Sequence, residues 1–400
     1  MIPFSPPRID DRTIEEVCAA LKSGWITTGP RVRKFEEMLS DYCKVNNVLC
    51  VSSNSAGMEL MLHWFGVGPG DEVIVPAYTY CATANVVVHC GATPVMVDVK
   101  EDFGIDVEAV RRAITPKTKV IMPVDIAGFP CDYDELNQLV REDAVRQLFT
   151  PDNEIQRQLG RILLLEDAAH SLGARYHRLP LGTQADLAVF SFHAVKNLTT
   201  AEGGAICLNL PHPFDNEALY KQLKIKSLHG QSKDALSKTQ AGNWRYDVTE
   251  AGYKCNMTDV LAAIGIVELE RYDSETLPRR KQIFDAYSNA FRNDPRFQVP
   301  IYETAEKQSS YHVYPLRINN ITEQQRDEIM QRIFQLEVSV NVHFIPLPML
   351  TFYRNAGYNI QNYPVTYDNF SREISLPVYY NLSDTQVQTV IEAVKKAVTF

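Results

Sequence analysis

The regular alternation of short apolar runs with helical segments constrains the fold of this chain more than any other feature. Each apolar run is uninterrupted and rich in Val, Ile and Leu, as expected of strands that are buried on both faces. The predicted strands cover residues 48–52, 72–76, 94–97, 119–124, 162–165 and 187–192, and the predicted helices between them cover residues 56–65, 83–89, 108–114 and 133–142. This order indicates an α/β fold with a mostly parallel sheet between two layers of helices.

The length of 400 residues exceeds what one compact core usually contains, since domains average roughly 150 residues. We expect a large domain over residues 1–270 and a smaller α+β domain over residues 271–400, on which the N-terminal segment can also pack. A long helix from about Leu261 is expected to connect the two. Residues 141–160 are predicted to form an extended helix and a loop. Residues 229–250 are polar and are expected to form a long functional or mobile segment.

The composition narrows the class of partners. The chain has a net charge of −9, with 45% hydrophobic and 22% charged residues, which is typical of a globular protein and not of a disordered chain or a membrane bundle. Nucleic-acid-binding chains usually have a basic balance, so we expect no nucleic-acid partner. We find no signal-peptide pattern at the N-terminus and no apolar stretch long enough for a bilayer helix, so we expect no membrane partner.

The cysteines and histidines indicate the compartment and argue against a metal site. None of the eight cysteines forms a C-x-x-C pair, and most have apolar or small neighbours, as buried thiols do in a reducing cytoplasm. The nine histidines include no H-E-x-x-H pattern. We therefore expect a cytoplasmic protein without a metal.

Two strand ends carry ionisable side chains that could take part in catalysis or ligand binding. The apolar strand at 162–165 runs into Asp167, and the strand at 187–192 runs into a loop that carries Lys196. Ligands of parallel sheets bind at the carboxyl ends of strands. Taken singly, Asp167 reads as a helix or turn cap and Lys196 as a surface lysine. Together they are what pyridoxal phosphate requires, namely a Schiff-base lysine and an acid that keeps the pyridine nitrogen protonated.

Phosphate and ring contacts can be sought at two other strand-to-helix junctions. The segment VSSNSAGM (51–58) leads from a strand into a helix, where free N–H groups and the Ser55 hydroxyl can bind an anion. Ser191, beside the lysine loop, can add a second hydroxyl. Tyr78 and Tyr80 follow another strand, and an aromatic ring there can stack on a flat heterocycle. An ordinary helix cap and ordinary packing residues explain each feature equally well when it is taken alone.

The chain resembles a known family, the DegT/DnrJ/EryC1/StrS pyridoxal-phosphate sugar aminotransferases of the fold-type-I aminotransferase superfamily. The resemblance spans most of the chain and is closest to the enzymes that aminate the 4-keto carbon of UDP-sugars. It implies a large domain with a mostly parallel seven-stranded sheet and a smaller α+β C-terminal domain. The matching segments are SGWITTGPRVRKFE (23–36), VSSNSAGM (51–58), GPGDEVIVPAYTYCATAN (68–85), GATPVMVDV (91–99), ITPKTKVIMPV (114–124), EDAAHSLGA (166–174), FSFHAVKNLTTAEGG (190–204), LHG (228–230) and GYKCNMTDVLAAIG (252–265).

The resemblance also implies a role for each matching residue. Lys196 is the expected catalytic residue, which forms the internal aldimine with pyridoxal 5'-phosphate and moves the proton. The expected cofactor-binding residues are Asp167 at the pyridine nitrogen, His170 near the phenolic oxygen or the ring face, Tyr80 stacked on the ring, Ser55, the Ala56 amide and Ser191 at the phosphate, and Asn256 at the phosphate of the neighbouring subunit. Trp25 and Thr28 are expected at the sugar-nucleotide entrance and His343 on the substrate side. Asn256 therefore implies a homodimer with shared active sites.

Three departures from the family pattern stand out. Asp125-Ile126-Ala127-Gly128 replaces a stretch that often has His and Tyr around its glycine, and Pro348 stands where His is frequent. Residues 141–160 are longer than usual. The first two put the sugar specificity in question, and the third looks peripheral.

The predicted activity is the transfer of an amino group, from L-glutamate, to the keto carbon, at C4, of a nucleotide-linked keto-sugar for polysaccharide or lipopolysaccharide biosynthesis. Three alternatives from the same family remain: a ketocyclitol aminotransferase, a sugar dehydratase and a regulatory protein that binds the cofactor. Dehydratases of the family replace the lysine with histidine, so Lys196 argues against that alternative. A fourth alternative is an α/β protein without a cofactor. It would leave unexplained why the residues expected at the ring nitrogen, the aldehyde and the phosphate all occur in the same chain.

Overall fold

The computed structural model describes residues 1–232 and 245–398. The N-terminal two-thirds contains the strands β1 (Asn47–Val51), β2 (Glu72–Pro76), β3 (Thr93–Val97), β4 (Thr118–Ile121), β5 (Leu163–Ala168), β8 (Leu187–Ser191) and β9 (Gly204–Leu208). Its helices are α1 (Asp11–Ser23), α2 (Pro30–Cys43), α3 (Asn54–Phe65), α4 (Cys81–His89), α5 (Val107–Ala113), α6 (Tyr133–Arg141), α7 (Asp143–Leu148), α8 (Glu154–Leu159), α9 (Asn216–Lys226) and α11 (Asp259–Glu270).

These strands form one seven-stranded sheet in the order β1-β9-β8-β5-β4-β2-β3. Strand β9 runs antiparallel to both of its neighbours, and the other neighbouring pairs are parallel. The six parallel strands therefore end at one edge of the sheet. The predicted α/β class and the mostly parallel seven-stranded sheet are confirmed.

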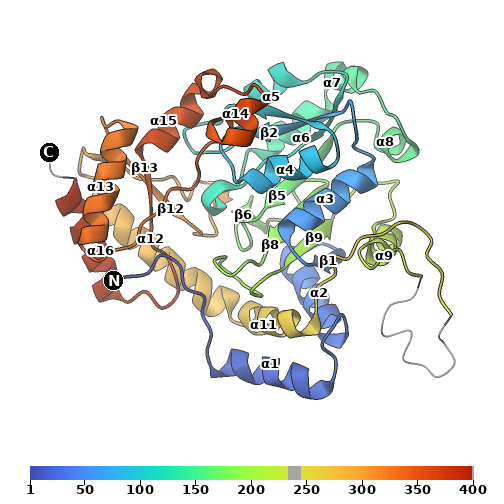
Figure 1. Cartoon of the computed structure of the whole chain (residues 1–400), viewed down its shortest axis with the longest axis horizontal. Coiled ribbons are helices and arrows are strands. Elements are labelled where there is room, and N and C mark those ends of the chain that lie inside the picture. Colours follow the sequence, from blue (N-terminus) through green and yellow to red (C-terminus); the bar gives the residue numbers. More distant parts are fainter. Residues whose placement is uncertain (233–244, 399–400) are drawn as a thin grey trace.

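Helices cover both faces of this sheet. Alternate residues of each strand face opposite sides, and the residues on both sides are apolar, so each face must be buried. In β1, Val48 and Cys50 belong to the core that α2 and α11 share with the sheet, whereas Leu49 and Val51 belong to the core beneath α3 and α4. Helix α1 packs along α11 on the outside of the first layer (Figure 1). Strands buried on both faces explain the uninterrupted apolar runs in the sequence.

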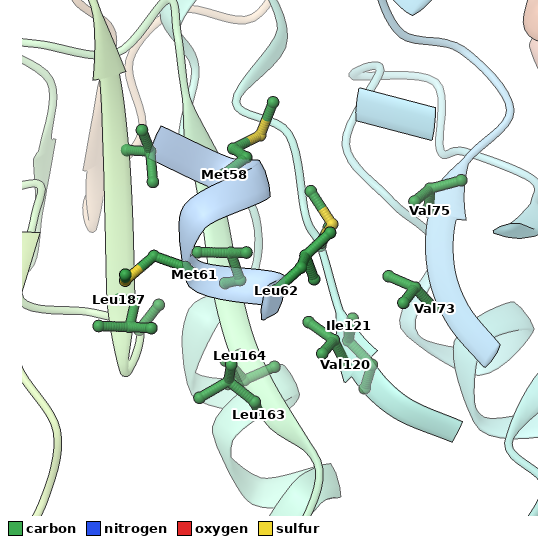
Figure 2. Close-up of a cluster of buried hydrophobic side chains, with 14 of the residues drawn as sticks. Met58, Met61, Leu62, Val73, Val75, Val120, Ile121, Leu163, Leu164 and Leu187 are labelled. Carbon is green, nitrogen blue, oxygen red and sulfur yellow. The ribbon is translucent and has the colours of Figure 1, made fainter. Parts of the chain in front are cut away.

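Helix α3 connects this core to the edge where the parallel strands end. Its side chains Met58, Met61 and Leu62 lie over the central strands, among Val120, Ile121, Leu163, Leu164 and Leu187 (Figure 2). A Cβ atom at Gly57 would lie 2.7 Å from Val189, so glycine permits the close approach of the helix to β8. Each buried Met or Leu contributes roughly 1.5–3 kcal/mol, which fixes the start of α3 beside the ends of β1, β8 and β9.

The C-terminal third has its own apolar core and a separate sheet in the order β10-β12-β13. Its elements are α12 (Leu277–Phe291), β10 (Phe297–Gln298), β12 (Tyr314–Ile318), α13 (Glu323–Gln335), α14 (Thr351–Asn355), α15 (Pro364–Arg372), β13 (Glu373–Leu376) and α16 (Asp384–Ala397). They gather on one side of the large sheet, and the N-terminal residues run along them (Figure 1). Ile2 packs in this core and pairs with Val338. A small third sheet combines β6 (Arg175–Tyr176), β7 (Leu179–Pro180) and β11 (Lys307–Gln308). The exact domain boundary at residue 270 stays a prediction.

Two predicted elements differ from the structure. The long helix expected from Leu261 is interrupted by a π-helical segment at Tyr272–Thr276, after which α12 begins. Pro278 explains the break, because proline has no N–H to donate to the carbonyl of Ser274 as a continuous helix would require, whereas it is tolerated in the first turn of α12. The extended helix expected at residues 141–160 is two short helices, α7 and α8, and the Asn153 side chain caps the second by accepting from Gln156 N–H. The predicted mobile segment at 229–250 lies partly outside the described residues. Within the part of the chain that the structure describes, no helix is long and apolar enough to cross a membrane.

Candidate active site

A cavity of about 310 Å³ opens at the edge of the sheet where the parallel strands end. This volume lies at the lower end of the range for small-molecule sites, roughly 300–1,000 Å³. Both parts of the chain contribute to it. The lining residues are Ser53, Asn54, Ser55, Thr79, Tyr80, Ala82, Val124, Ile126, Asp167, Ala169, His170, Ser191, His193, Val195, Lys196, Glu202, Gly203, His312, His343 and Phe344. The structure thus brings together seven of the predicted site residues: Ser55, Tyr80, Asp167, His170, Ser191, Lys196 and His343.

Asp167 lies at the end of β5 with its carboxylate buried and held from two sides. Asn54 Nδ2 donates to Oδ1 at 3.0 Å, and Thr83 Oγ1 donates to Oδ2 at 2.8 Å. The backbone N–H of Ala169 also donates to Oδ1. Burial raises the pKa of Asp167, and these hydrogen bonds together with the charge of Lys196 oppose the rise. The carboxylate is therefore fixed in place and suited to hold a cationic ring nitrogen.

Lys196 lies in the loop after β8 and lines the same cavity. The backbone of this loop turns back on itself, since Lys196 N–H donates to His193 C=O at 2.9 Å. Burial lowers the pKa of Lys196 to about 8, and the charge of Asp167 limits this shift. A lysine with this pKa has a substantial fraction of neutral amine near neutral pH, which is the form that attacks a carbonyl.

The start of α3 supplies the hydroxyl and amide groups expected of an anion site. Ser53 caps the helix by accepting from Ala56 N–H at 3.1 Å, and Ser55 follows in its first turn. A Cβ atom at Gly204 would lie 2.6 Å from Asn54 N, so glycine at the start of β9 is needed for this close approach. Ser191 faces the same cavity from β8. Ala56 itself does not line the cavity.

Three histidines, His170, His312 and His343, form one wall of the cavity. Hydrogen bonds define the tautomers of the first two. His170 Nδ1 accepts from Ala127 N–H at 3.2 Å, so its proton is on Nε2 and can be donated. Asn197 donates from Nδ2 to Ser310 C=O, so its Oδ1 accepts from His312 Nδ1–H at 2.8 Å. Burial, followed by nearby positive charge, lowers the pKa of His170 and of His312 well below its usual value. The wall therefore offers neutral donors and acceptors.

Three predicted residues lie outside the cavity, in a second cluster. Asn256 Nδ2 donates to Thr28 Oγ1 at 2.6 Å, and Thr28 Oγ1 donates to Met257 C=O at 2.6 Å. Trp25 lies beside the same loop, against Gly29. The backbone of Ser52 donates to Cys255 C=O, which places this cluster next to the end of β1. Asn256, Thr28 and Trp25 are thus grouped together and do not line the cavity that contains Lys196.

Sequence patterns did not point to four residues that shape the site. Asn54 and Thr83 lie within the segments predicted to bind the phosphate and the ring, but their contact with Asp167 depends on how α3 and α4 meet β5. Asn197 directly follows the lysine, yet an amide gives no local signal of its role. His312 comes from the C-terminal part, where the run SSYHVYP has no recognisable motif. Packing brings these four residues together.

Of the stretch Asp125-Ile126-Ala127-Gly128, Ile126 lines the cavity, whereas Asp125 does not, and neither does Pro348. The Asp125 side chain is fully buried, accepts from Cys131 N–H and Tyr133 O–H, and lies beside the buried carboxyl of Glu166. Two buried carboxyls in contact cannot both be ionised at low cost, so they share a proton. Burial, followed by repulsion from Asp125, raises the pKa of Glu166 well above its usual value.

This carboxyl pair makes stability fall with rising pH. The pKa of Glu166 is higher in the folded chain than in the unfolded chain. Above the unfolded value of about 4.3, the folded state therefore keeps a proton that the unfolded state has lost, and the free energy of unfolding falls as the pH rises. Glu166→Gln, which keeps a hydrogen-bond donor for Asp125, is expected to raise the free energy of unfolding by about 1–3 kcal/mol at alkaline pH, the typical cost of one unsatisfied buried polar group. Urea unfolding from acid to alkaline pH measures this. The exposed Glu154→Gln is the control, and an equal slope in all three proteins would contradict the shared proton.

The donor set fits one cofactor well. A buried carboxylate suits the pyridinium nitrogen, a lysine of lowered pKa suits the aldehyde, and the hydroxyls at the start of α3 suit the phosphate. Among the residues that the structure describes, no group of His, Cys, Asp or Glu is arranged to hold a metal ion. Fold and site together define a pyridoxal-phosphate enzyme of the aminotransferase type.

Comparison with known proteins identifies the family. The model of the DegT/DnrJ/EryC1/StrS aminotransferase family matches residues 7–149 and 153–395. The chain is 38% identical to the uncharacterized protein MJ1066 of Methanocaldococcus jannaschii, covering 100% of this chain and 98% of that one. It is 34% identical to the spore coat polysaccharide biosynthesis protein SpsC of Bacillus subtilis, covering 99% and 97%.

Solved structures agree with this assignment. Spr1654 of Streptococcus pneumoniae, described as a sugar aminotransferase, superposes in its PMP form with a TM-score of 0.95 at 46% identity, covering 99% of both chains. PseC of Helicobacter pylori, an aminotransferase involved in pseudoaminic acid biosynthesis, has a TM-score of 0.85 at 26% identity, covering 99% and 98%. The chain belongs to the DegT/DnrJ/EryC1/StrS aminotransferase family. The predicted family, fold type, enzyme class and cofactor, pyridoxal phosphate, are confirmed.

Proposed function

We propose that this sugar aminotransferase moves an amino group from L-glutamate to the keto carbon at C4 of a nucleotide-linked keto-sugar. The observation that carries the proposal is the single cavity in which Lys196 and Asp167 face a wall of neutral histidines. Sugar hydroxyls are neutral donors and acceptors, so they match such a wall better than charged groups do. The choice of C4 and of glutamate extends the resemblance to UDP-4-keto-sugar aminotransferases.

The residues of this chain then have distinct tasks. Pyridoxal phosphate supplies an electron sink for the carbon that loses or gains a proton. Asp167, held by Asn54 and Thr83, keeps the ring nitrogen protonated. Lys196 Nζ would take the proton from the α-carbon of the amino donor and deliver it to the exocyclic carbon of the cofactor; with the keto-sugar the transfer would run in reverse and end on the keto carbon. His170 donates from Nε2 to an oxygen on the ring or the substrate.

A homodimer is part of this proposal. Lys196 is the one lysine or arginine among the described residues that line the cavity, yet the cofactor and a nucleotide-sugar both carry phosphates. Trp25, Thr28 and Asn256 form a separate cluster that can serve the cavity of a second subunit. Such an arrangement would supply polar groups to the phosphates from outside each chain.

The biological setting follows from the relatives. SpsC is a polysaccharide biosynthesis protein, and PseC acts in the biosynthesis of pseudoaminic acid. We propose that the product of this chain is likewise an amino sugar for polysaccharide or lipopolysaccharide biosynthesis. All eight cysteines are free thiols, which supports a reducing, cytoplasmic compartment.

The test uses the pyridoxamine form of the enzyme, prepared with glutamate. This form is mixed with UDP- and dTDP-linked 4-keto sugars, the matching 3-keto sugars and a ketocyclitol, and the return of the pyridoxal absorption band is followed. We expect a 4-keto nucleotide-sugar to restore the band fastest. Acceptance of a 3-keto sugar alone would contradict amination at C4.

The same experiment separates the remaining alternatives. A ketocyclitol as the preferred acceptor would assign the enzyme to cyclitol amination. Binding of pyridoxal phosphate without conversion by glutamate would indicate a regulatory protein. The exposed variant Lys221→Ala, in which a surface pair with Glu217 is lost, serves as the control for handling and folding.

A further inference from the structure

Behind His343, a chain of hydrogen bonds leads from the cavity to a buried carboxyl. His343 Nδ1 lies 2.8 Å from Ser375 Oγ, and Ser375 Oγ donates to Glu373 Oε1. The second carboxylate oxygen, Glu373 Oε2, accepts from the backbone N–H of His343 at 3.2 Å. Glu373 therefore contacts His343 twice, once directly and once through Ser375.

The fold of the C-terminal part produces this alignment. Strand β13 alternates, so Ile374 and Leu376 face the apolar core while Glu373 and Ser375 face the opposite side. Ser375 pairs through its backbone with Asn341, two residues before His343. Glu373 and Ser375 are fully buried, so water does not compete for these hydrogen bonds. Phe4 stacks on the His343 ring at 5.3 Å between centroids and restrains its rotation.

We propose that Ser375 and Glu373 are positioning residues that set which nitrogen of His343 carries the proton, and so whether the cavity offers the sugar substrate an acceptor or a donor. When Glu373 is ionised, the Ser375 hydroxyl must donate to it, so Ser375 Oγ accepts from His343 Nδ1–H. His343 Nε2 then has a free lone pair. When Glu373 is protonated, it donates to Ser375 Oγ, whose hydroxyl turns to His343 Nδ1, and the proton moves to Nε2.

Burial and the surrounding charges place the titration of Glu373 near neutral pH. Burial raises the pKa of Glu373 to about 8, opposed by the hydrogen bonds from Ser375 and His343 and by the charges of Arg326 and Arg317. Both arginines direct guanidinium N–H groups to other oxygens: Arg326 to the backbone of Phe370 and Glu373, and Arg317 to Asn369.

The other titratable groups near these hydrogen bonds leave His343 neutral. Burial, followed by the charge of Lys196, lowers the pKa of His343 to about 4, so the ring does not gain a second proton near neutral pH. His170 and His312, the other titratable rings beside it, also have a lowered pKa. Burial, followed by the charge of Glu373, raises the pKa of the nearby Tyr78 well above its usual value. The change is thus one of tautomer and not of charge on the ring.

Glu373→Gln tests this directly. The amide oxygen must accept from the backbone N–H of His343, which leaves the NH₂ group to donate to Ser375 Oγ. The variant therefore imitates protonated Glu373 at every pH. In the holoenzyme labelled with ¹⁵N-histidine, with His343 assigned through His343→Gln, we expect wild type to pass from the Nε2–H tautomer to the Nδ1–H tautomer as the pH rises through about 8. Glu373→Gln is expected to keep Nε2–H throughout.

Two further variants isolate the serine. Ser375→Ala is expected to remove the pH dependence of the tautomer, and Ser375→Thr to restore it, because threonine returns the hydroxyl. Ser371→Ala, which removes a nearby hydroxyl bonded to Asp368 C=O, is the matched control and should behave as wild type. If Glu373→Gln does not fold, the serine series alone still decides the outcome.

The inference rests on the proposed function only for its effect on catalysis. With the accepted keto-sugar, we expect Glu373→Gln to change kcat/KM by about tenfold, mainly through KM, since one substrate hydrogen bond is altered. A tautomer of wild-type His343 that is the same at acidic and alkaline pH would overturn the inference. A normal tautomer change with no keto-sugar turnover would overturn the proposed substrate and leave the inference intact.

Discussion

Lys196→Ala is expected to lower turnover by at least about 10³-fold, because the neutral amine that forms the covalent link and moves the proton is removed. The variant should still bind pyridoxal phosphate through Asp167 and the start of α3, but without the absorption band of lysine-bound cofactor. Single-turnover conversion by glutamate and the absorption spectrum measure both effects. A spectrum and turnover equal to those of wild type would show that another group performs the task.

The lowered pKa of Lys196 gives a second readout for the same residue. Burial brings its pKa to about 8, so the fraction of neutral amine in the cofactor-free protein rises with pH and levels off above that value. The rate at which added pyridoxal phosphate becomes covalently bound should follow the same curve. A rate that levels off only above the ordinary lysine pKa of about 10.4 would contradict the burial of this side chain.

Subunit mixing tests the second cluster with the same variant. A mixed dimer of Lys196→Ala and Asn256→Ala subunits contains one cavity in which both residues are intact, provided that Asn256 acts on the neighbouring subunit. Activity should then exceed that of either parent dimer. No gain on mixing would place Asn256 and Lys196 in service of the same chain's cavity.

Local patterns were sufficient to predict the six parallel strands and their ends, but not the antiparallel strand β9, and the number of seven strands came from the family resemblance. Strands buried on both faces leave uninterrupted apolar runs, and a carboxylate or lysine that follows such a run must lie near the edge of the sheet. For this reason the sequence alone was enough to pair Asp167 with Lys196. The same patterns did not predict where helices begin and end, since Pro278 and the N-cap at Asn153 each act over a single turn.

The remainder of the site depends on contacts between segments that are distant in sequence. Thr83 and Asn54 reach Asp167 only because α4 and α3 start beside β5. His312 enters the cavity from the C-terminal part, where its neighbours carry no motif, and His343, which enters from the same part, was expected only from the family resemblance. The stretch Asp125-Ile126-Ala127-Gly128 put the sugar specificity in question; Ile126 lines the cavity, whereas the Asp125 side chain accepts from Cys131 and Tyr133. Orientation of a side chain on a loop is set by packing, which spacing does not encode.

Asp167→Asn is expected to lower turnover by roughly 10²–10⁴-fold while the fold is kept. The amide is isosteric: its one oxygen can still accept from Asn54 and Ala169, and its NH₂ group can donate to Thr83 Oγ1, but it carries no charge to hold a protonated ring nitrogen. Removing one partner of a buried charge pair costs about 3–5 kcal/mol, which corresponds to this range of rates. Stopped-flow measurement of the glutamate half-reaction gives the value.

The same substitution should act in the opposite direction on the cofactor-free protein. Burial raises the pKa of Asp167 in the folded chain, so an ionised carboxylate destabilises the empty cavity once the pH exceeds the unfolded value of about 3.9. Asp167→Asn avoids this cost, and its melting temperature at neutral pH should equal or exceed that of wild type. A cofactor analogue methylated at the ring nitrogen, which is permanently positive there, should recover part of the lost rate in the variant. Loss of rate without such recovery, together with a lower melting temperature, would mean that Asp167 supports the fold and does not act on the ring nitrogen.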